Sequence, residues 1–475
     1  MNLHLHPKQG EALRSQATEI LYGGAAGGGK SHLLRAAAIA WCADIPGLRV
    51  YLFQRSLPDL VKNHMEGPGG FPALLGEWLT AGFIKIDRTK GQIAFWNGAR
   101  IHLRHCRDRK DLTSFLGAEI HVLMIDELTQ WPWDMYRFLR GRVRPGRLKL
   151  PARHKGRFPR VLTGASPGGI GHTAVKTAFV DPAPAMAITE MPKAEGGMRR
   201  QYIPARLEDN PTLIEIDPDY EARLEARGGP ALVRALRHGD WDIVAGGMFD
   251  DVWDKARHVV PPFEIPASWR VDRAFDWGSS KPFSVGWWAE SDGSEVRLAD
   301  GTTRSTVPCE LYRIAEWYGW NGRPDEGCRM LAKDIALGIR EREKGLGLAP
   351  GLAVRPGPAD SAIFDIENGN CLADDMAAAG IAWEKADKSP GSRKQGWQKL
   401  RAMLKVAAAP AGVRDAPGLY VFETCRHFIR TLPVLPRAER DPDDVDSAAE
   451  DHIGDETRYR IFTRRRGVTT SEFEI

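Results

Sequence analysis

A glycine-rich loop near the start of this chain constrains its fold more than any other stretch. Residues 24–31 read Gly-Ala-Ala-Gly-Gly-Gly-Lys-Ser, which matches the pattern G-x-x-x-x-G-K-[ST]. The apolar run at 19–22 predicts a strand before the loop, and the pattern at 31–40 predicts a helix after it. This order indicates an α/β fold. The alternative is a loop that only caps a helix, and the matching flanks disfavour it.

The composition of the loop predicts a site for nucleotide phosphates. Glycines such as Gly24 and Gly29 let the backbone turn so that successive N–H groups face an anion, and the helix N-terminus adds partial positive charge. We expect Lys30 to reach the β- and γ-phosphates of ATP and Ser31 to bind Mg²⁺.

A second apolar segment completes the predicted nucleotide site. Residues 122–125 read Val-Leu-Met-Ile and are followed by Asp126 and Glu127. Since ligands gather at the carboxyl ends of parallel strands, we expect Asp126 to bind Mg²⁺ near Ser31. Glu127 is expected to orient and deprotonate the attacking water. An acid at the end of a strand is common, so Asp126 and Glu127 indicate a nucleotide site only in combination with the glycine-rich loop at 24–31.

Further residues are candidates for reading or sensing the nucleotide. Gln9 can pair with adenine through its amide donor and acceptor, although a Gln at a helix start is also an ordinary surface residue. The turn at 163–168 follows another apolar strand, and Ser166 is expected near the γ-phosphate; a plain turn is the alternative. The sequence does not choose an arginine finger among Arg55, Arg142 and Arg144.

Length and composition limit the class of protein. The chain has 475 residues, too many for one ordinary core, and an ordinary globular composition with 43% hydrophobic and 27% charged residues. No apolar run approaches the ~20 residues that span a membrane, and the start has no signal-peptide pattern. Six scattered cysteines without a C-x-x-C pair indicate reduced thiols and argue against a zinc site.

Charge is distributed unevenly, although the net value is only +4. Residues 137–160 contain ten Lys or Arg and no acid, whereas 439–456 contain nine acids and one Arg. A basic stretch suits a polyanion and an acidic one suits metal ions, but either can also be a solvated surface.

The apolar runs divide the chain into two predicted domains. Residues 1–245 alternate strand and helix patterns, as in βαβ units around a largely parallel sheet, with strands at 20–22, 50–53, 122–125 and 160–163. Residues 246–270 are rich in Gly and Pro and are interpreted as a linker. A second domain is predicted at 271–475, with strands near 283–288, 310–317 and 351–356 and a charged tail after Arg466.

Three carboxylates of the second domain could bind metal ions. Asp276 ends an apolar strand, Asp360 follows the strand predicted near 352–355, and Asp455 lies in a helix-like stretch. Two cations that clamp a phosphodiester require carboxylates from different segments. Asp451 and His452 each share a helix face with Asp455. Each acid by itself is more typical of a cap or turn.

Basic residues lie between these acids along the chain and could follow a phosphate backbone without reading sequence. They are Lys385, Lys388, Arg393, Lys394 and Lys399. Trp397, among them, is interpreted as a core residue rather than a platform for stacking a base.

Taken in order, these motifs resemble those of the large terminase subunit of tailed bacteriophages. The glycine-rich loop and the stretches at 124–127, 163–167, 237–242, 275–278 and 451–459 have counterparts in that family. The resemblance implies an N-terminal P-loop ATPase of the RecA/ASCE-like class with a parallel sheet, and a C-terminal α/β nuclease domain of the RNase H-like fold. The chain departs at the turn, where the family reads closer to Asn-Pro and this chain has Ser166-Pro167. The γ-phosphate sensor is therefore left open.

The resemblance also implies a function and a set of site residues. ATP hydrolysis would drive duplex DNA into the prohead, and a two-metal endonuclease would cut concatemeric DNA. The metal roles carry over to Asp276, Asp360 and Asp455, for Mg²⁺ or Mn²⁺, since both accept octahedral oxygen ligands. By the same resemblance His452 assists catalysis or metal binding, and Asp451 is a weaker candidate.

The resemblance extends to partners and location. The implied partners are double-stranded DNA, a portal protein and a small terminase subunit. The implied assembly is a homo-oligomeric ring, a pentamer, on the prohead, with a monomer as the isolated state. The implied location is the cytoplasm of the infected bacterial host, with no membrane contact and no place in the mature virion.

Two other functions stay as alternatives. A helicase–nuclease of repair or defence would require a second motor domain with its own helicase motifs, which the sequence after residue 245 does not show. A nucleotide-switched binding module needs no strong water activator, and Glu127 argues against it.

Overall fold

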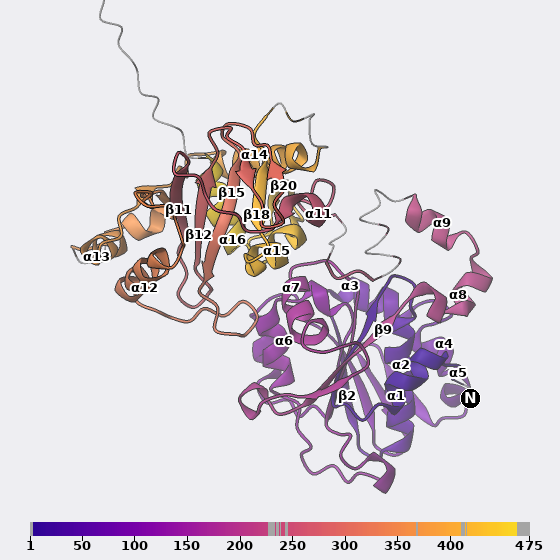
Figure 1. Ribbon diagram of the computed structural model, residues 1–475. Helices are drawn as coiled ribbons and strands as arrows, with labels where there is room; N and C mark the ends of the chain where they lie inside the picture. Colours follow the sequence, from indigo (N-terminus) through magenta and orange to yellow (C-terminus); the bar gives the residue numbers. More distant parts are fainter. Residues whose placement is uncertain are drawn as a thin grey trace, which may run out of the picture. The chain divides into compact units, whose positions relative to one another are not determined.

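The computed structural model describes residues 3–226, 233, 237, 239–242, 246–366, 369–409, 414 and 416–462. The chain divides into two units, Met1–Asp250 and Asp251–Ile475, and each is built around its own sheet (Figure 1). His238 and the charged tail around Arg466, both singled out from the sequence, lie outside the described residues.

The sheet of the first unit is parallel at its centre. Its strand order is β3-β4-β5-β2-β6-β7-β1-β9-β8, and neighbours from β5 to β9 run parallel. The predicted parallel sheet is therefore confirmed, with antiparallel pairs β3–β4, β4–β5 and β8–β9 added at the edges. The strands are β1 (Glu19–Gly24), β2 (Arg49–Gln54), β3 (Ile84–Asp87), β4 (Gln92–Phe95), β5 (Arg100–His105), β6 (Val122–Ile125), β7 (Arg160–Ala165), β8 (Ile188–Glu190) and β9 (Arg199–Ala205).

Helices cover both faces of this sheet (Figure 1). They are α1 (Pro7–Arg14), α2 (Lys30–Asp44), α3 (Leu57–Leu60), α4 (Phe71–Leu74), α5 (Gly76–Thr80), α6 (Trp133–Arg140), α7 (His172–Val175), α8 (Pro211–Ile216) and α9 (Tyr220–Glu225). Short 3₁₀ or π turns are η1 (Val61–Met65), η2 (Asp111–Phe115), η3 (Leu128–Gln130), η4 (Ala152–His154), η5 (Lys176–Val180), η6 (Lys193–Glu195) and η7 (Leu207–Asp209).

The core of the first unit lies on both sides of the sheet. In β1, Ile20 and Tyr22 pack with α2, whereas Leu21 packs into a separate cluster with α6 and α7. Successive side chains of a strand point to opposite faces, so a strand buried on both faces is apolar at consecutive positions. This explains the continuous apolar run before the glycine-rich loop.

The sheet of the second unit has the order β10-β18-β15-β12-β11-β16-β17. Strands β11, β12 and β15 pair antiparallel in succession, and β16 and β17 continue parallel beside β11. Numbered from β11, the five strands β15-β12-β11-β16-β17 have the order 3-2-1-4-5, that of an RNase H-like sheet, with β18 and β10 added beside β15, and this confirms the predicted fold class. The strands are β10 (Val259–Val260), β11 (Arg270–Asp276), β12 (Ser284–Glu290), β13 (Val296–Arg297), β14 (Thr303–Arg304), β15 (Leu311–Tyr318), β16 (Pro358–Ala359), β17 (Glu384–Lys385), β18 (Leu419–Phe422), β19 (Arg437–Ala438) and β20 (Asp441–Val445).

The helices of the second unit include a long C-terminal helix, α16, that packs on β11 and β12. They are α11 (Lys255–His258), α12 (Ala332–Lys344), α13 (Leu372–Ala378), α14 (Ser392–Ala408), α15 (Arg426–Thr431) and α16 (His452–Phe462), with 3₁₀ turns η8 (Ser361–Phe364) and η9 (Leu432–Val434). Trp397 is fully buried beneath Gly454, so its predicted core position is confirmed.

Two boundaries differ from the sequence interpretation. The segment interpreted as a linker at 246–270 contributes α11 and β10 to the second unit, and Val260, Phe263 and Ile265 are buried there. Packing of these apolar residues stabilises an otherwise irregular Pro-rich backbone. The strand predicted at 351–356 is a single bridge at Arg355, and the strand itself is β16 (Pro358–Ala359).

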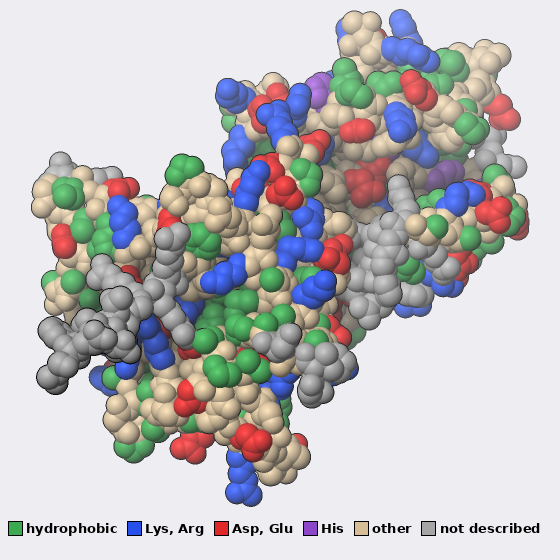
Figure 2. Space-filling view, turned by 90° about the horizontal axis from the view of Figure 1, so that it is seen from above, with side chains coloured by type: hydrophobic (Ala, Val, Ile, Leu, Met, Phe, Trp, Pro, Cys, Tyr) green, Lys and Arg blue, Asp and Glu red, His purple; other side chains and the backbone are tan. Residues whose placement is uncertain are grey.

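Charged side chains are spread over the surface. Basic and acidic groups are interspersed on the face seen in Figure 2. Among the helices that the structure describes, none combines the length and the apolar character required to cross a bilayer.

Candidate functional site

The glycine-rich loop joins β1 to α2 at the carboxyl end of a central parallel strand. Helix α2 begins at Lys30, and its N-cap Gly29 has φ +72°, which glycine adopts without strain. Side chains hold the loop carbonyls: Gln9 Nε2 donates to Gly29 O (3.0 Å), Tyr22 OH to Gly28 O (3.2 Å) and Asn210 Nδ2 to Gly27 O (2.7 Å). These bonds fix the loop before a ligand binds, as a preorganised anion site requires.

The loop is joined directly to the acidic end of β6. Lys30 Nζ donates to Ala25 O at 2.8 Å, so the ammonium group lies within the loop. Ser31 Oγ donates to Asp126 Oδ2 at 2.7 Å, across 95 positions of sequence. The structure therefore brings Lys30, Ser31 and Asp126 together, in the arrangement expected for a nucleotide with a bound cation.

Asp126 is buried, and one of its oxygens is held from three directions. Oδ2 accepts from Ser31 and from Gln54 Nε2 (3.2 Å), and it lies 3.1 Å from His64 Nε2. Burial acts to raise the pKa of Asp126, but His64, Ser31 and Lys30 outweigh it, and the pKa is lowered. Among the described residues Oδ1 has no hydrogen-bond partner. An ionised carboxylate with one free oxygen fits a divalent cation or its water.

Glu127 is held in an unusual backbone conformation. Its φ is +54° and its ψ is +58°, a left-handed geometry that is uncommon outside glycine and frequent at active sites. Burial raises its pKa, Lys30 opposes this, and the charge of Asp126 adds to it. The backbone N–H of Ser166 donates to its carboxylate. A carboxylate of raised pKa is a better base for a water proton.

The other residues predicted for the nucleotide site have defined positions. Gln9 is buried, and its amide both donates to Gly29 O and accepts from His6 N, so reading adenine would require these bonds to exchange. Gly24 ends β1 with φ +125°. Ser166 lies beside Glu127 after β7, and its carbonyl accepts from Thr129 Oγ1 at 2.8 Å.

The three candidate arginines differ in their contacts and exposure. Arg55 lies over the ring of Trp131 and donates to Cys106 O at 3.3 Å. Arg142 donates to Leu116 O at 2.9 Å. Arg144 is exposed. Of the three, Arg144 is therefore the best placed to reach a neighbouring molecule.

In the second unit, two candidate carboxylates lie at adjacent strand ends. Phe275 of β11 pairs in parallel with Ala359 of β16, and the next residues are Asp276 and Asp360. Asp360 N–H donates to Phe275 O at 2.9 Å, which holds the two strand ends together. Parallel pairing in register thus places the two acids side by side, as expected for ligands at the carboxyl edge of a sheet.

Helix α16 carries the third candidate carboxylate, Asp455, and two of its other side chains contact Asp276. His452 Nδ1 lies 3.1 Å from Asp276 Oδ2, and Tyr459 OH donates to Asp276 Oδ1 at 3.3 Å. Burial, with added repulsion from Asp455 and Asp360, raises the pKa of Asp276 to about 7 although His452 opposes it. Burial, followed by the charges of Asp276, Asp455 and Asp360, raises the pKa of Tyr459, so all three carboxylates act electrostatically on this tyrosine.

Basic side chains neutralise this cluster. Lys388 forms an ion pair with Asp360. Arg393 Nη1 donates to Asp455 Oδ2 at 2.9 Å, and Nη2 donates to Asp451 Oδ2 at 3.0 Å. Within the described ranges no three His, Cys, Asp or Glu side chains form a metal-binding group as they stand. The donor chemistry itself fits hard divalent cations, since the converging groups are carboxylate oxygens whose mutual repulsion a cation would relieve.

Several residues of both sites were not found from the sequence. Gln54 and His64 contact Asp126, and Tyr459 contacts Asp276. One signal was available for Tyr459, which lies four positions after Asp455 and so shares its helix face. Gln54 and His64 carry no such signal, because their role depends on β2 lying next to β6.

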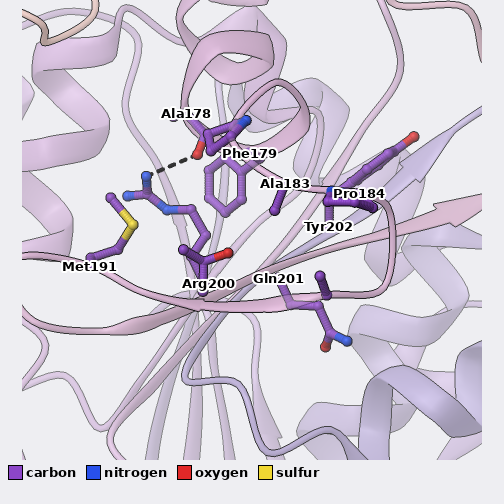
Figure 3. A pocket seen from close by; sticks show the side chains of 11 residues that line it. Ala178, Phe179, Ala183, Pro184, Met191, Arg200, Gln201 and Tyr202 are labelled. Atoms are coloured by element: carbon purple, nitrogen blue, oxygen red, sulfur yellow. Dashed lines mark hydrogen bonds between the residues drawn. The ribbon is translucent and has the colours of Figure 1, made fainter.

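A small cavity lies beside the edge strand β8, its neighbour β9 and the turn η5 (Figure 3). Its volume is about 10 Å³, and its lining includes Phe179, Arg200 and Tyr202. Arg200 Nη1 donates to Ala178 O at 3.0 Å across it. A space of this size holds about one water molecule, so it is no nucleotide site.

Part of the first unit matches a known protein family. Residues 21–139 match the family described as "Terminase large subunit, T4likevirus-type, N-terminal". This segment contains the glycine-rich loop together with Asp126 and Glu127. The predicted resemblance to large terminases is confirmed. A search of curated proteins found no match.

Solved structures of terminases also resemble the chain. The large terminase of a thermophilic bacteriophage, solved in complex with ADP, is 15% identical, with 98% of this chain and 100% of that chain covered and a TM-score of 0.39. The HK97 bacteriophage large terminase is 11% identical over 97% and 95%, with a TM-score of 0.43. The P22 large terminase nuclease domain is 19% identical over 45% and 89%, with a TM-score of 0.31. At this level of likeness the fold assignment rests on the strand order and register of the chain itself.

Proposed function

We propose that this chain is a bacteriophage DNA-packaging motor subunit, in which the first unit hydrolyses ATP and the second cuts duplex DNA. The proposal is supported by the parallel pairing that sets Asp276 and Asp360 at adjacent strand ends, with His452 of α16 3.1 Å from Asp276, in a chain whose other unit joins Ser31 to Asp126. The large terminase of the thermophilic bacteriophage has been solved in complex with ADP and with ATP-gamma-S, and ATP is the nucleotide proposed for this chain.

In the ATPase unit each residue has a distinct task. Lys30 binds the β- and γ-phosphates, and Ser31 and Asp126 hold Mg²⁺, which when bound neutralises developing phosphate charge. Glu127 takes the proton of the attacking water, and its position next to Ser166 links it to the turn after β7. Movement of that turn on loss of the γ-phosphate is the proposed step that passes hydrolysis to DNA.

In the nuclease unit Asp276, Asp360 and Asp455 would hold Mg²⁺ or Mn²⁺, which when bound activates water and stabilises the leaving oxygen. His452 and Tyr459 fix the two oxygens of Asp276. Lys388 and Arg393, which neutralise the acids, would turn to DNA phosphates once cations occupy the carboxylates. Asp451, which also contacts Arg393, would assist in holding it.

The proposed partners follow from this function. They are double-stranded DNA, a portal protein and a small terminase subunit, with a homo-oligomeric ring on the prohead in the cytoplasm of the infected host. A helicase–nuclease would need a second motor domain with its own parallel sheet. Among the described residues, the main sheet after residue 250 is the RNase H-like one, so this alternative has no support.

Two single variants test the division of labour. Lys30→Ala is expected to lose ATP turnover and keep plasmid cleavage, because Lys30 lies in the first unit's loop. Asp276→Ala is expected to lose cleavage and keep ATP turnover. Plasmid cleavage at the wild-type rate by Asp276→Ala would remove the nuclease proposal. Strand displacement on a forked duplex by the wild type would favour the helicase–nuclease.

A further inference from the structure

Apart from the finger candidates Arg142 and Arg144, the basic stretch at 137–160 has no part in either site described above. It connects α6 to β7 and contains ten Lys or Arg and no acid. Some of these side chains anchor the segment to its own unit. Arg157 Nη2 donates to Leu13 O at 2.5 Å, Arg160 Nη2 donates to Ala17 O at 2.9 Å, and Arg153 pairs with Asp44. These contacts hold the segment in place on the first unit.

Two cations of the stretch, Arg147 and Lys149, lie with Arg49 around an open hollow at the amino ends of β2 and β6. The hollow has a volume of about 620 Å³ and is lined by Pro46, Gly47, Arg49, Glu119, His121, Arg147, Leu148 and Lys149. Arg49 is the first residue of β2, and His121 directly precedes β6. The glycine-rich loop follows the carboxyl end of β1, so the hollow lies at the opposite edge of the parallel sheet. We call Arg49, Arg147 and Lys149 the amino-edge cations.

The backbone presents these cations outward. Arg147 and Lys149 are exposed and alternate with Leu148 and Leu150, which pack against the core beneath. The start of the segment is bound to the sheet by a parallel bridge between Val143 and Ile120. Alternating anchors and cations on a fixed segment make a rigid charged surface rather than a loose loop.

The lining of the hollow includes one acid, Glu119, and this acid already contacts two basic neighbours. Glu119 Oε1 lies 3.5 Å from Arg49 Nη1 and 3.2 Å from His121 Nε2. A pair at 3.5 Å with a half-exposed arginine is weak, so Arg49 keeps most of its positive field. The surface thus attracts an anion.

The chemistry of the lining favours a phosphate backbone as that anion. Protein partners are usually held by an apolar or aromatic centre, and single-stranded nucleic acids by aromatic platforms for their bases. The lining of this hollow has no Phe, Tyr or Trp among the described residues. Lys and Arg alone are sufficient for phosphates of duplex DNA.

We propose that the amino-edge cations bind the phosphate backbone of double-stranded DNA, without reading its sequence. This rests on the proposed function and adds a second DNA contact to it, separate from the nuclease centre. Strand β2 connects the two ends of the unit: it begins at Arg49 and ends at Gln54, whose amide donates to Asp126. A DNA load on this surface therefore acts on a strand that also contacts the nucleotide site.

The test uses the full-length chain and a duplex of random sequence. In Arg147→Gln/Lys149→Gln two exposed cations are removed without burying or exposing apolar surface. The control, Arg88→Gln/Lys90→Gln, removes the same charge from the exposed turn between β3 and β4. Binding is measured by fluorescence anisotropy over a roughly fourfold range of salt, from about 50 to about 200 mM. Circular dichroism melting verifies the fold of both variants.

The expected result is a change in the salt dependence. Loss of two phosphate contacts should lower the slope of log K against log salt by about 1.8, and weaken binding at least ~10-fold at low salt, while the control stays near wild type. An unchanged slope in Arg147→Gln/Lys149→Gln overturns the inference. So does unchanged duplex affinity combined with loss of prohead binding, which would assign the surface to a protein partner. If the wild type itself neither hydrolyses ATP nor binds duplex DNA, the proposed function fails and this inference fails with it.

Discussion

Replacing Asp276 with Asn tests the electrostatics of the candidate metal centre with almost no change in side-chain size. Asp276 is only 5% exposed, and burial together with Asp455 and Asp360 raises its pKa from 3.8 to about 7 despite His452. Between about pH 4 and pH 7 the folded protein binds a proton here that the unfolded chain has released. The stability of the metal-free protein therefore falls as pH rises through this range.

The size of the effect follows from the pKa difference. Asn resembles the protonated carboxyl and does not titrate, so it removes the penalty at high pH. A difference of about 3 pKa units corresponds to about 4 kcal/mol at pH 8 and about 2 kcal/mol at pH 5. For a unit of this size, about 4 kcal/mol is about 10 °C in melting temperature. Titration of His452 changes the stability in the same direction. Its pKa is raised in the folded protein, so it contributes stability below pH 6.5 that is lost as pH rises through the folded-state pKa.

The assay is scanning calorimetry of the full chain in EDTA at pH 5 and pH 8. Asp276→Asn should melt higher than wild type, with the larger gain at pH 8. Mg²⁺ or Mn²⁺ should then raise the melting temperature of the wild type more at pH 8 than at pH 5, and should raise that of the variant less, because a neutral amide binds a cation more weakly than a carboxylate.

Asp272→Asn is the matched control on the same strand. Burial raises the pKa of Asp272 as well, but Arg460 Nε lies 2.5 Å away and opposes this shift, so Asp272→Asn removes an ion pair and should lower the stability at both pH values. If Asp276→Asn is also less stable than wild type at pH 8, then the ionised Asp276 carboxylate does not destabilise the folded protein. The inference that burial and neighbouring acids raise its pKa would then be wrong.

Variants at three further positions test the ATPase unit. His64→Leu removes the imidazole 3.1 Å from Asp126 and should raise the Mg²⁺ concentration for half-maximal ATPase about 10-fold, while His64→Gln retains a donor and should lose less; equal effects would mean that only volume matters. Glu127→Gln should bind nucleotide, by equilibrium dialysis, yet hydrolyse it at least ~100-fold more slowly, and near-normal turnover would exclude it as the base. Gly23→Ala would bring a Cβ to 2.1 Å from the carbonyl of Ala165, so we expect a large loss of stability in urea unfolding; wild-type stability would contradict this geometry.

The sequence alone was sufficient for the local parts of this protein. The strand, glycine turn and helix around residues 19–44 are set by neighbouring residues, and so is the apolar strand that ends at Asp126. The parallel sheet also followed, because strands buried on both faces read as continuous apolar runs. In the second unit Asp276 was located by the strand that it ends, whereas the strand before Asp360 was predicted a few residues too early, because β16 is only two residues long.

Only the tertiary structure decided which of these parts meet. Gln54 and His64 reach Asp126 because β2 lies beside β6, and Tyr459 and Arg393 enter the carboxylate cluster because α16 and α14 pack together on their sheet. The segment at 251–270 reads as a linker by composition but lies in the second unit because Val260 pairs with β18. Periodicity and turn residues act over a few positions, whereas strand order and helix packing are settled by burial across the whole unit, and sequence spacing carries no direct record of them.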